Sequence, residues 1–163
     1  MLSLRAAVAA DVPLILELVC ELATYERAPD AVVATESDLL RDGFGAAPRF
    51  RVLLAEWSGE PAGFAFYFLG YSTWRGRPVL YLEDLFVRPQ HRKRGIGLAL
   101  MRRLARLAVA EGCPRFLWEV LDWNEPALRF YASLGAQVLP GWLNVRLEGE
   151  ALARLAREGG HEG

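Results

Sequence analysis

The segment YLEDLFVRPQHRKRGIGLALMRRLARLAVA, residues 81–110, decides the fold of this 163-residue chain. PVLYLEDLFV (78–87) is rich in apolar and β-branched or aromatic residues and predicts a strand. The loop RPQHRKRG (88–95) follows it, and apolar residues at helical spacing predict a helix over about 96–111. A strand that passes through a basic, glycine-containing loop into a helix is the organising unit from which the rest of the fold is inferred.

Helices and strands are predicted on both sides of this unit. They are a helix over 12–26 capped by Asp11, a short helix opened by the capping-box pair Thr35 and Asp38 and ended by Gly43, strands over 50–57 and 62–71, a strand over 115–121, a helix from near Pro126 to Gly135, a strand over about 137–147 and a helix over 149–157. This order predicts an α/β (α+β) fold with a mixed central sheet flanked by helices. We expect one domain over residues 1–163, with a flexible tail at about 158–163.

The composition narrows the class of protein. Hydrophobic residues make up 53% and charged residues 24% of the chain, which is typical of a globular protein with a sizeable core. A formal charge of −1 disfavours a broad nucleic-acid-binding face. Two histidines and two cysteines do not form a zinc-finger spacing or a disulfide framework, so no metal is expected. No export signal or run of about 20 apolar residues is present, which predicts a cytoplasmic protein without a membrane partner.

The loop before the helix predicts a phosphate site. Gly95 and Gly97 allow the backbone to approach a ligand, and the free N–H groups at a helix start favour an anion. Four basic residues add positive charge: Arg88, Arg92, Lys93 and Arg94. The residues after Gly97 do not match a Walker P-loop or a dinucleotide fingerprint. A solvated basic loop before an ordinary amphipathic helix remains an alternative reading of the glycine spacing alone.

Arg92-x-x-Gly95-x-Gly97, preceded by LFVRP (85–89), resembles the acetyl-CoA-binding signature of the GNAT N-acetyltransferase superfamily. The resemblance extends from about Leu4 to Arg157. Longer strings are similar to the diamine (spermidine/spermine) acetyltransferase group and its thialysine-acetylating branch: LLRDGFG (39–45), YSTWRGR (71–77), YLEDLFV (81–87), VLDWN (120–124) and DWNEP (122–126).

The resemblance implies that acetyl-CoA is the cosubstrate. It implies that main-chain amides from Arg94 to Leu98 hold the pyrophosphate and that the main chain at 85–87 pairs with the pantetheine arm. The cofactor-binding residues that it implies are Leu85, Phe86, Val87, Arg92, Lys93, Arg94, Gly95, Ile96, Gly97, Leu98, Asn124 and Tyr131. Lys93 and Arg94 stand where diamine acetyltransferases often carry a glycine and a neutral residue.

Acetyl transfer to an amine requires a base for the incoming ammonium and is helped by an acid for the leaving thiolate. Glu83, acting through water, is the predicted base, and Asp84 serves substrate charge or structure. Regular strand alternation sends these two side chains to opposite faces, although a bulge would change this. Solvated or arginine-paired carboxylates are the structural alternative.

Tyr131 is the predicted acid, because it resembles the GNAT tyrosine near the cofactor sulfur and a tyrosine hydroxyl can donate a proton. The structural alternative is that Tyr131 is a half-buried core residue beside Phe130. For Asn124, which resembles an asparagine that contacts the cofactor, the alternative is a helix cap. Neither cysteine stands in a recognisable nucleophile setting, which favours direct transfer.

A cationic acceptor calls for acidic and aromatic walls. The resemblance implies that Tyr25 and Glu26 contact the substrate, and Ser72, Thr73 and Leu121 are similar to the thialysine-acetylating branch. The other predicted substrate-binding residues are Trp74, Glu83, Asp84, Trp118 and Glu119. Ser72 stands where the polyamine branch has an aspartate, which favours a shorter, diamine-like or thialysine/lysine-like amine. Acetylation of a protein or peptide amine and a non-catalytic acetyl-CoA-binding module are the alternatives. The resemblance also implies a homodimer, to which a strand near 143–147 would contribute if it is not an ordinary intrachain strand.

Overall fold

The computed structural model describes residues 1–158, so most of the predicted tail lies outside the described residues. The chain divides into two compact units, Met1–Glu119 and Val120–Gly163. The first contains the whole sheet, and the second contains two helices and the segment between them.

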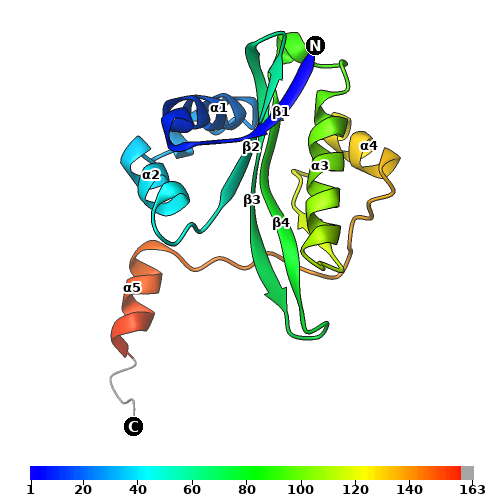
Figure 1. Cartoon of the computed structure of the whole chain (residues 1–163). Helices are drawn as coiled ribbons and strands as arrows, with labels where there is room; N and C mark the ends of the chain where they lie inside the picture. Colours follow the sequence, from blue (N-terminus) through cyan, green and yellow to red (C-terminus); the bar gives the residue numbers. More distant parts are fainter. Residues whose placement is uncertain (159–163) are drawn as a thin grey trace. The chain divides into compact units, whose positions relative to one another are not determined.

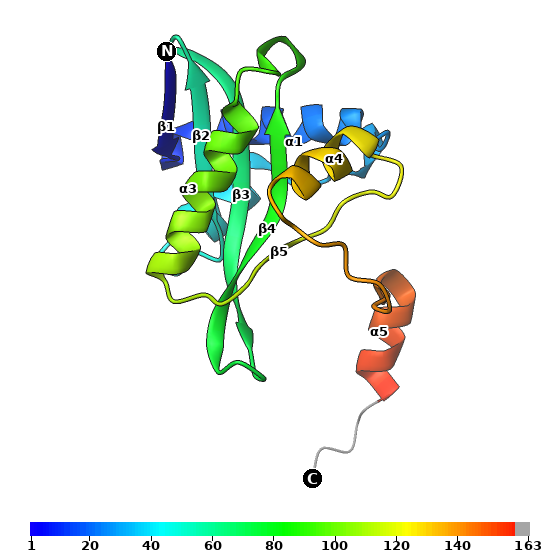
Figure 2. The ribbon, with the colours of Figure 1, turned by 90° about the vertical axis from the view of Figure 1, so that its right-hand side faces the viewer.

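The first unit is built on one five-stranded sheet. Its strands are β1 (Leu2–Ala6), β2 (Arg51–Trp57), β3 (Glu60–Ser72), β4 (Arg77–Val87) and β5 (Phe116–Trp118). They lie side by side in sequence order (Figure 2), and all neighbouring pairs are antiparallel except β4 and β5, which are parallel. The predicted mixed sheet is therefore confirmed. The last strand is shorter than predicted, because its pairing with β4 covers only Leu80–Leu82.

Helices cover both faces of this sheet. Helices α1 (Val12–Tyr25) and α2 (Glu36–Phe44) lie on one face, and α3 (Ile96–Ala110) lies on the other (Figure 1). Three short 3₁₀ turns connect elements: η1 (Ala9–Asp11), η2 (Pro29–Ala31) and η3 (Pro89–His91). The fully buried side chains from α1, α3 and the sheet include Ile15, Leu18, Phe64, Leu100 and Leu104.

The helix termini confirm one local prediction and correct two others. Thr35 and Asp38 form the predicted capping box, with the Asp38 N–H donating to Thr35 Oγ1. Asp11 precedes α1, but its carboxylate accepts from the Val8 N–H and from the Arg5 guanidinium, so it does not cap the helix with its side chain. Gly43 does not end α2: it lies inside the helix, where a Cβ would stand 2.4 Å from ring carbons of Phe50.

The second unit contains α4 (Glu125–Ser133) and α5 (Gly149–Glu158), close to their predicted bounds. The strand predicted at about 137–147 is wrong for the single chain, because these residues are irregular. A strand needs a neighbouring strand to take its main-chain hydrogen bonds. The segment nevertheless keeps alternating apolar residues, with Leu143 and Val145 89% and 93% exposed.

Within residues 1–158, no helix is both long enough and apolar enough to cross a bilayer. The same residues include no cluster of three or more histidine, cysteine or acidic side chains arranged to hold a metal ion.

Candidate active site

A β-bulge in β4 brings two carboxylates to one face of the sheet. Phe66 pairs with Asp84 and Tyr67 pairs with Leu82, so Glu83 is an extra residue without a partner on β3. Directly opposed residues share a face, and Phe66 packs against the core beneath α1, so Asp84 faces α1. Glu83 stands two positions after Tyr81, whose ring lies 5.0 Å from that of Phe68 on the same face. The bulge therefore provides the irregularity that lets both carboxylates serve one site.

The charge of a further carboxylate, that of Glu26, acts on Asp84. Burial, followed by the charges of Glu83 and Glu26, raises the pKa of Asp84 to about 7. Burial also raises the pKa of Glu26 at the end of α1. Burial, with the charges of Glu119 and Glu83, raises the pKa of Tyr81. Three predicted substrate residues thus form one acidic group, Glu26, Glu83 and Asp84, and a fourth, Glu119, acts on Tyr81. Among residues 1–158, no cationic side chain forms an ion pair with Asp84.

The raised pKa makes Asp84 a source of pH-dependent instability. Its folded-state pKa of about 7 lies above the usual aspartate value of 3.8, so the folded protein binds more protons than the unfolded chain between these two pH values. The contribution of Asp84 to the free energy of unfolding is fully present below about pH 4 and is lost as the pH rises through about 7. We expect Asp84→Asn to raise the free energy of unfolding by about 2–4 kcal/mol at pH 8 and by much less near pH 4.

Urea denaturation of the wild type and Asp84→Asn at pH 4, 6 and 8 measures this difference. Asp30→Asn, at an exposed carboxylate in η2, is the control. An Asp84→Asn effect that does not change with pH would contradict the assigned cause.

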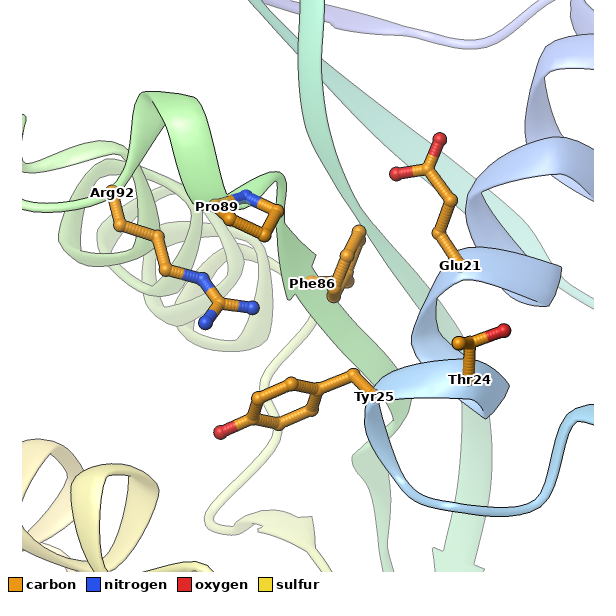
Figure 3. Close-up of a pocket in the computed structure, with 6 residues that line it drawn as sticks. All are labelled: Glu21, Thr24, Tyr25, Phe86, Pro89 and Arg92. Atoms are coloured by element: carbon orange, nitrogen blue, oxygen red, sulfur yellow. The ribbon is translucent and has the colours of Figure 1, made fainter.

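A pocket of about 330 Å³ lies between the end of α1 and the beginning of the loop after β4. Its lining residues are Glu21, Thr24, Tyr25, Phe86, Pro89 and Arg92 (Figure 3). The guanidinium of Arg92 lies over the Tyr25 ring, 4.7 Å from its centroid, and 5.8 Å from the centroid of Phe86. The pocket therefore joins one predicted acceptor residue, Tyr25, to two predicted cofactor residues.

The start of α3 offers main-chain donors to an anion. Gly95 stands at the N-cap with φ +76°, and this N-cap makes no side-chain hydrogen bond to the helix. A Cβ added at Gly95 would meet nothing within 4 Å, so the space beside the loop is open. The first amides of a helix have no acceptor within the helix, and the helix dipole favours negative charge there. This donor set fits a diphosphate.

Three of the four basic side chains of this loop, those of Arg88, Arg92 and Arg94, contact other parts of the protein. The expectation that all four add positive charge around a phosphate stays a prediction. Arg88 forms ion pairs with Glu17 and Glu21 of α1, at 2.5 and 2.6 Å. The Arg92 Nε donates to the Val87 carbonyl at 2.9 Å. The guanidinium of Arg94 lies 5.0 Å from the centroid of the Trp57 ring.

The open edge of β4 lies beyond its pairing with β5. The Arg88 N–H donates to the Ala62 carbonyl at 2.9 Å, which places the main-chain groups of residues 86 and 88 toward β3. Those of Leu85 and Val87 point to the opposite edge, where β5 has already ended. Phe86 contributes its ring to the pocket, and its main-chain groups belong to the β3 ladder.

The structure separates part of the predicted substrate set from the acidic group. Ser72, Thr73 and Trp74 lie at the tip of the β3–β4 hairpin, and Trp74 is 85% exposed. Ser72 pairs with Arg77, seven positions before Asp84, which is about 23 Å along a strand. Trp118 ends β5, and its ring lies 4.9 Å from Phe116.

Leu121, Asn124 and Tyr131 belong to the second unit. The side chain of Asn124 caps α4, its Oδ1 accepting from the Ala127 N–H at 3.3 Å. The Tyr131 ring lies 5.4 Å from that of Phe130. Tyr131 lies within α4, and Asn124 is the N-cap residue that precedes it. The roles assigned to these residues stay predictions.

Three pocket residues were not predicted from the sequence: Glu21, Thr24 and Pro89. Glu21 could have been predicted from the sequence, because it precedes Tyr25 by four residues and therefore lies on the same face of α1.

Three comparisons relate the chain to known proteins. Residues 15–136 match the model of the acetyltransferase (GNAT) family. A thialysine N-epsilon-acetyltransferase from Bos taurus is 42% identical, with 94% of this chain and 96% of that protein covered. An L-ornithine N5-acetyltransferase from Arabidopsis thaliana is 31% identical over 93% of this chain and 86% of its own length. The structure of an integron cassette protein from V. cholerae superposes with a TM-score of 0.81 at 29% identity, covering 96% of this chain and 98% of that one.

Proposed function

The chain belongs to the acetyltransferase (GNAT) family and is an N-acetyltransferase, and we propose that acetyl-CoA is its donor and a diamine-like or thialysine/lysine-like primary amine its acceptor. The observation that carries this proposal is the acidic group on the α1 face of the sheet, because its carboxylates attract and deprotonate an ammonium. Glu26 of this group directly follows Tyr25, which lines the pocket together with Arg92 of the cofactor loop.

In the proposed reaction the acceptor nitrogen attacks the thioester carbonyl, the C–N bond forms and the C–S bond breaks. Asp84 and Glu83 take the proton from the ammonium, directly or through water. A general base works best when its pKa lies near the operating pH, and Asp84 meets that condition. Tyr131 donates a proton to the leaving thiolate. The chain contributes mainly by positioning the amine against the thioester and by managing these two protons.

The amides that begin α3 are the proposed diphosphate ligands, from Arg94 to Leu98. The open edge of β4 at Leu85 and Val87 is the proposed partner of the pantetheine arm, in place of a continuous run over 85–87. The Val87 carbonyl accepts a hydrogen bond from Arg92 Nε. When the pantetheine arm binds, this carbonyl accepts from both partners, or the bond to Arg92 breaks.

Release of free thiol from acetyl-CoA, measured across a panel of acceptors, tests the function. We expect higher kcat/KM with thialysine and lysine than with spermidine, because the chain is 42% identical to a thialysine N-epsilon-acetyltransferase. Peptides with a free amine are included in the panel. Turnover only with peptides would assign a protein amine as acceptor, and acetyl-CoA binding without turnover of any amine would indicate a binding module.

We further propose a homodimer. Its support is the segment 137–147, which is irregular and exposes the alternating apolar side chains of Leu143, Val145 and Leu147. Light scattering should give twice the chain mass of 18.2 kDa. Leu143→Asp combined with Val145→Asp should return the protein to one chain mass, and a wild-type monomer would overturn the proposal.

We also propose that residues 1–163 act as one N-acetyltransferase domain in the cytoplasm. The thiols of Cys20 and Cys113 are free, as a reducing compartment would keep them.

A further inference from the structure

Lys93 is the single lysine of the chain, and its backbone has an unusual conformation. Its φ of +62° lies in the left-handed region that favours glycine. A lysine at such a position is held there by its surroundings, and residues of this kind concentrate at functional sites. Its side chain is exposed on the loop that leads into α3.

Lys93 also differs from its basic neighbours in what it contacts. Arg88 is paired with Glu17 and Glu21, while the guanidinium groups of Arg92 and Arg94 lie over aromatic rings. Lys93 makes no hydrogen bond, ion pair or ring contact with any other described residue. It is therefore the one basic side chain of the loop that is not committed to another part of the protein described here.

The chemistry of the proposed donor supplies a ligand for this ammonium. Coenzyme A carries a diphosphate and, on the adjoining ribose, a separate 3′-phosphate. The amides at the start of α3 are suited to the diphosphate, because they are fixed donors at the positive end of a helix dipole. A phosphate monoester holds about 1.5 to 2 negative charges at neutral pH. A mobile point charge on a four-carbon stem is suited to such a group at the rim of the site.

We propose that Lys93 binds the 3′-phosphate of the donor and makes the enzyme prefer coenzyme A thioesters over donors that lack this phosphate. The inference rests on the proposed use of acetyl-CoA and adds a specificity-determining residue to that site. It explains why a lysine occupies a backbone conformation that glycine would adopt without strain.

Calorimetric titration of the full chain with coenzyme A and with 3′-dephospho-coenzyme A tests the inference without relying on turnover. We expect the wild type to bind coenzyme A about three- to tenfold more tightly, the range of a solvent-exposed pair between an ammonium and a phosphate. Lys93→Gln keeps the backbone conformation and most of the stem, and it should abolish this preference while leaving the affinity for the dephosphorylated ligand unchanged. Lys93→Arg should retain the preference, and raising the salt concentration should reduce it.

Arg102→Gln, which removes one exposed positive charge from the outer face of α3, is the matched control and should leave the preference intact. If Lys93→Gln lowered the affinity for both ligands equally, Lys93 would contact the diphosphate, and the inference would be overturned. An unchanged preference in Lys93→Gln would overturn it as well. Failure of the wild type to bind either ligand would instead refute the proposed donor, so the two failures are distinguishable.

Discussion

Asp84→Asn is expected to remove the ionisation near pH 7 from the kcat/KM profile and to lower kcat about 10²- to 10⁴-fold. The base must be deprotonated to accept a proton, so the wild-type rate should rise with pH through about 7. An asparagine cannot take up the proton at any pH. The loss of rate should therefore persist at pH 9, where the wild-type carboxylate is fully ionised.

Glu83→Gln separates the roles of the two bulge carboxylates. The negative charge of Glu83 contributes to the raised pKa of Asp84, so its removal should move the rising limb of the profile to lower pH while the limb remains. If Glu83→Gln abolishes the limb and Asp84→Asn only shifts it, the base is Glu83, as the sequence suggested.

Glu36→Gln, at an exposed position in the first turn of α2, is the control for loss of one acidic charge. Its profile should match that of the wild type. Profiles that are the same in the wild type, Asp84→Asn and Glu83→Gln would remove the bulge from the chemistry altogether.

Local sequence signals predicted the elements of the fold well, because each depends on a few neighbouring residues. The Thr35–Asp38 capping box and the buried stripe of α3, which includes Leu100 and Leu104, are confirmed. Gly43 shows where this reasoning fails. A glycine near a helix end suggests that the helix stops there. Here the missing Cβ instead makes room for the ring of Phe50, which lies outside the helix, so the helix pattern alone does not reveal the contact.

The candidate site depended on features that neighbouring residues do not determine. The position of the bulge is set by the register between β3 and β4, so the sequence could name Glu83 and Asp84 but could not place both on one face. The partners of Arg88 and Arg94 lie on α1 and β2, far along the chain. A count of basic residues in the loop therefore could not show which of these side chains have partners elsewhere in the fold.

Tyr131→Phe is expected to lower kcat about 10²-fold at saturating acetyl-CoA. The substitution removes one oxygen and keeps the ring, which lies 5.4 Å from Phe130 on α4. If the hydroxyl acts as the acid, we expect the loss to fall on turnover and the affinity for coenzyme A to change little.

The division between kcat and KM decides what the Tyr131 hydroxyl does. An acid acts on the leaving thiolate only in the transition state, so its loss lowers kcat and kcat/KM by the same factor. If the hydroxyl only holds the cofactor, its removal weakens binding equally in the ground state and the transition state. KM for acetyl-CoA would then rise and kcat would stay intact. Tyr71→Phe, at a tyrosine of β3 that is 68% exposed, controls for the loss of a hydroxyl. Unchanged turnover of Tyr131→Phe at every pH would assign the protonation of the thiolate to water or to another group.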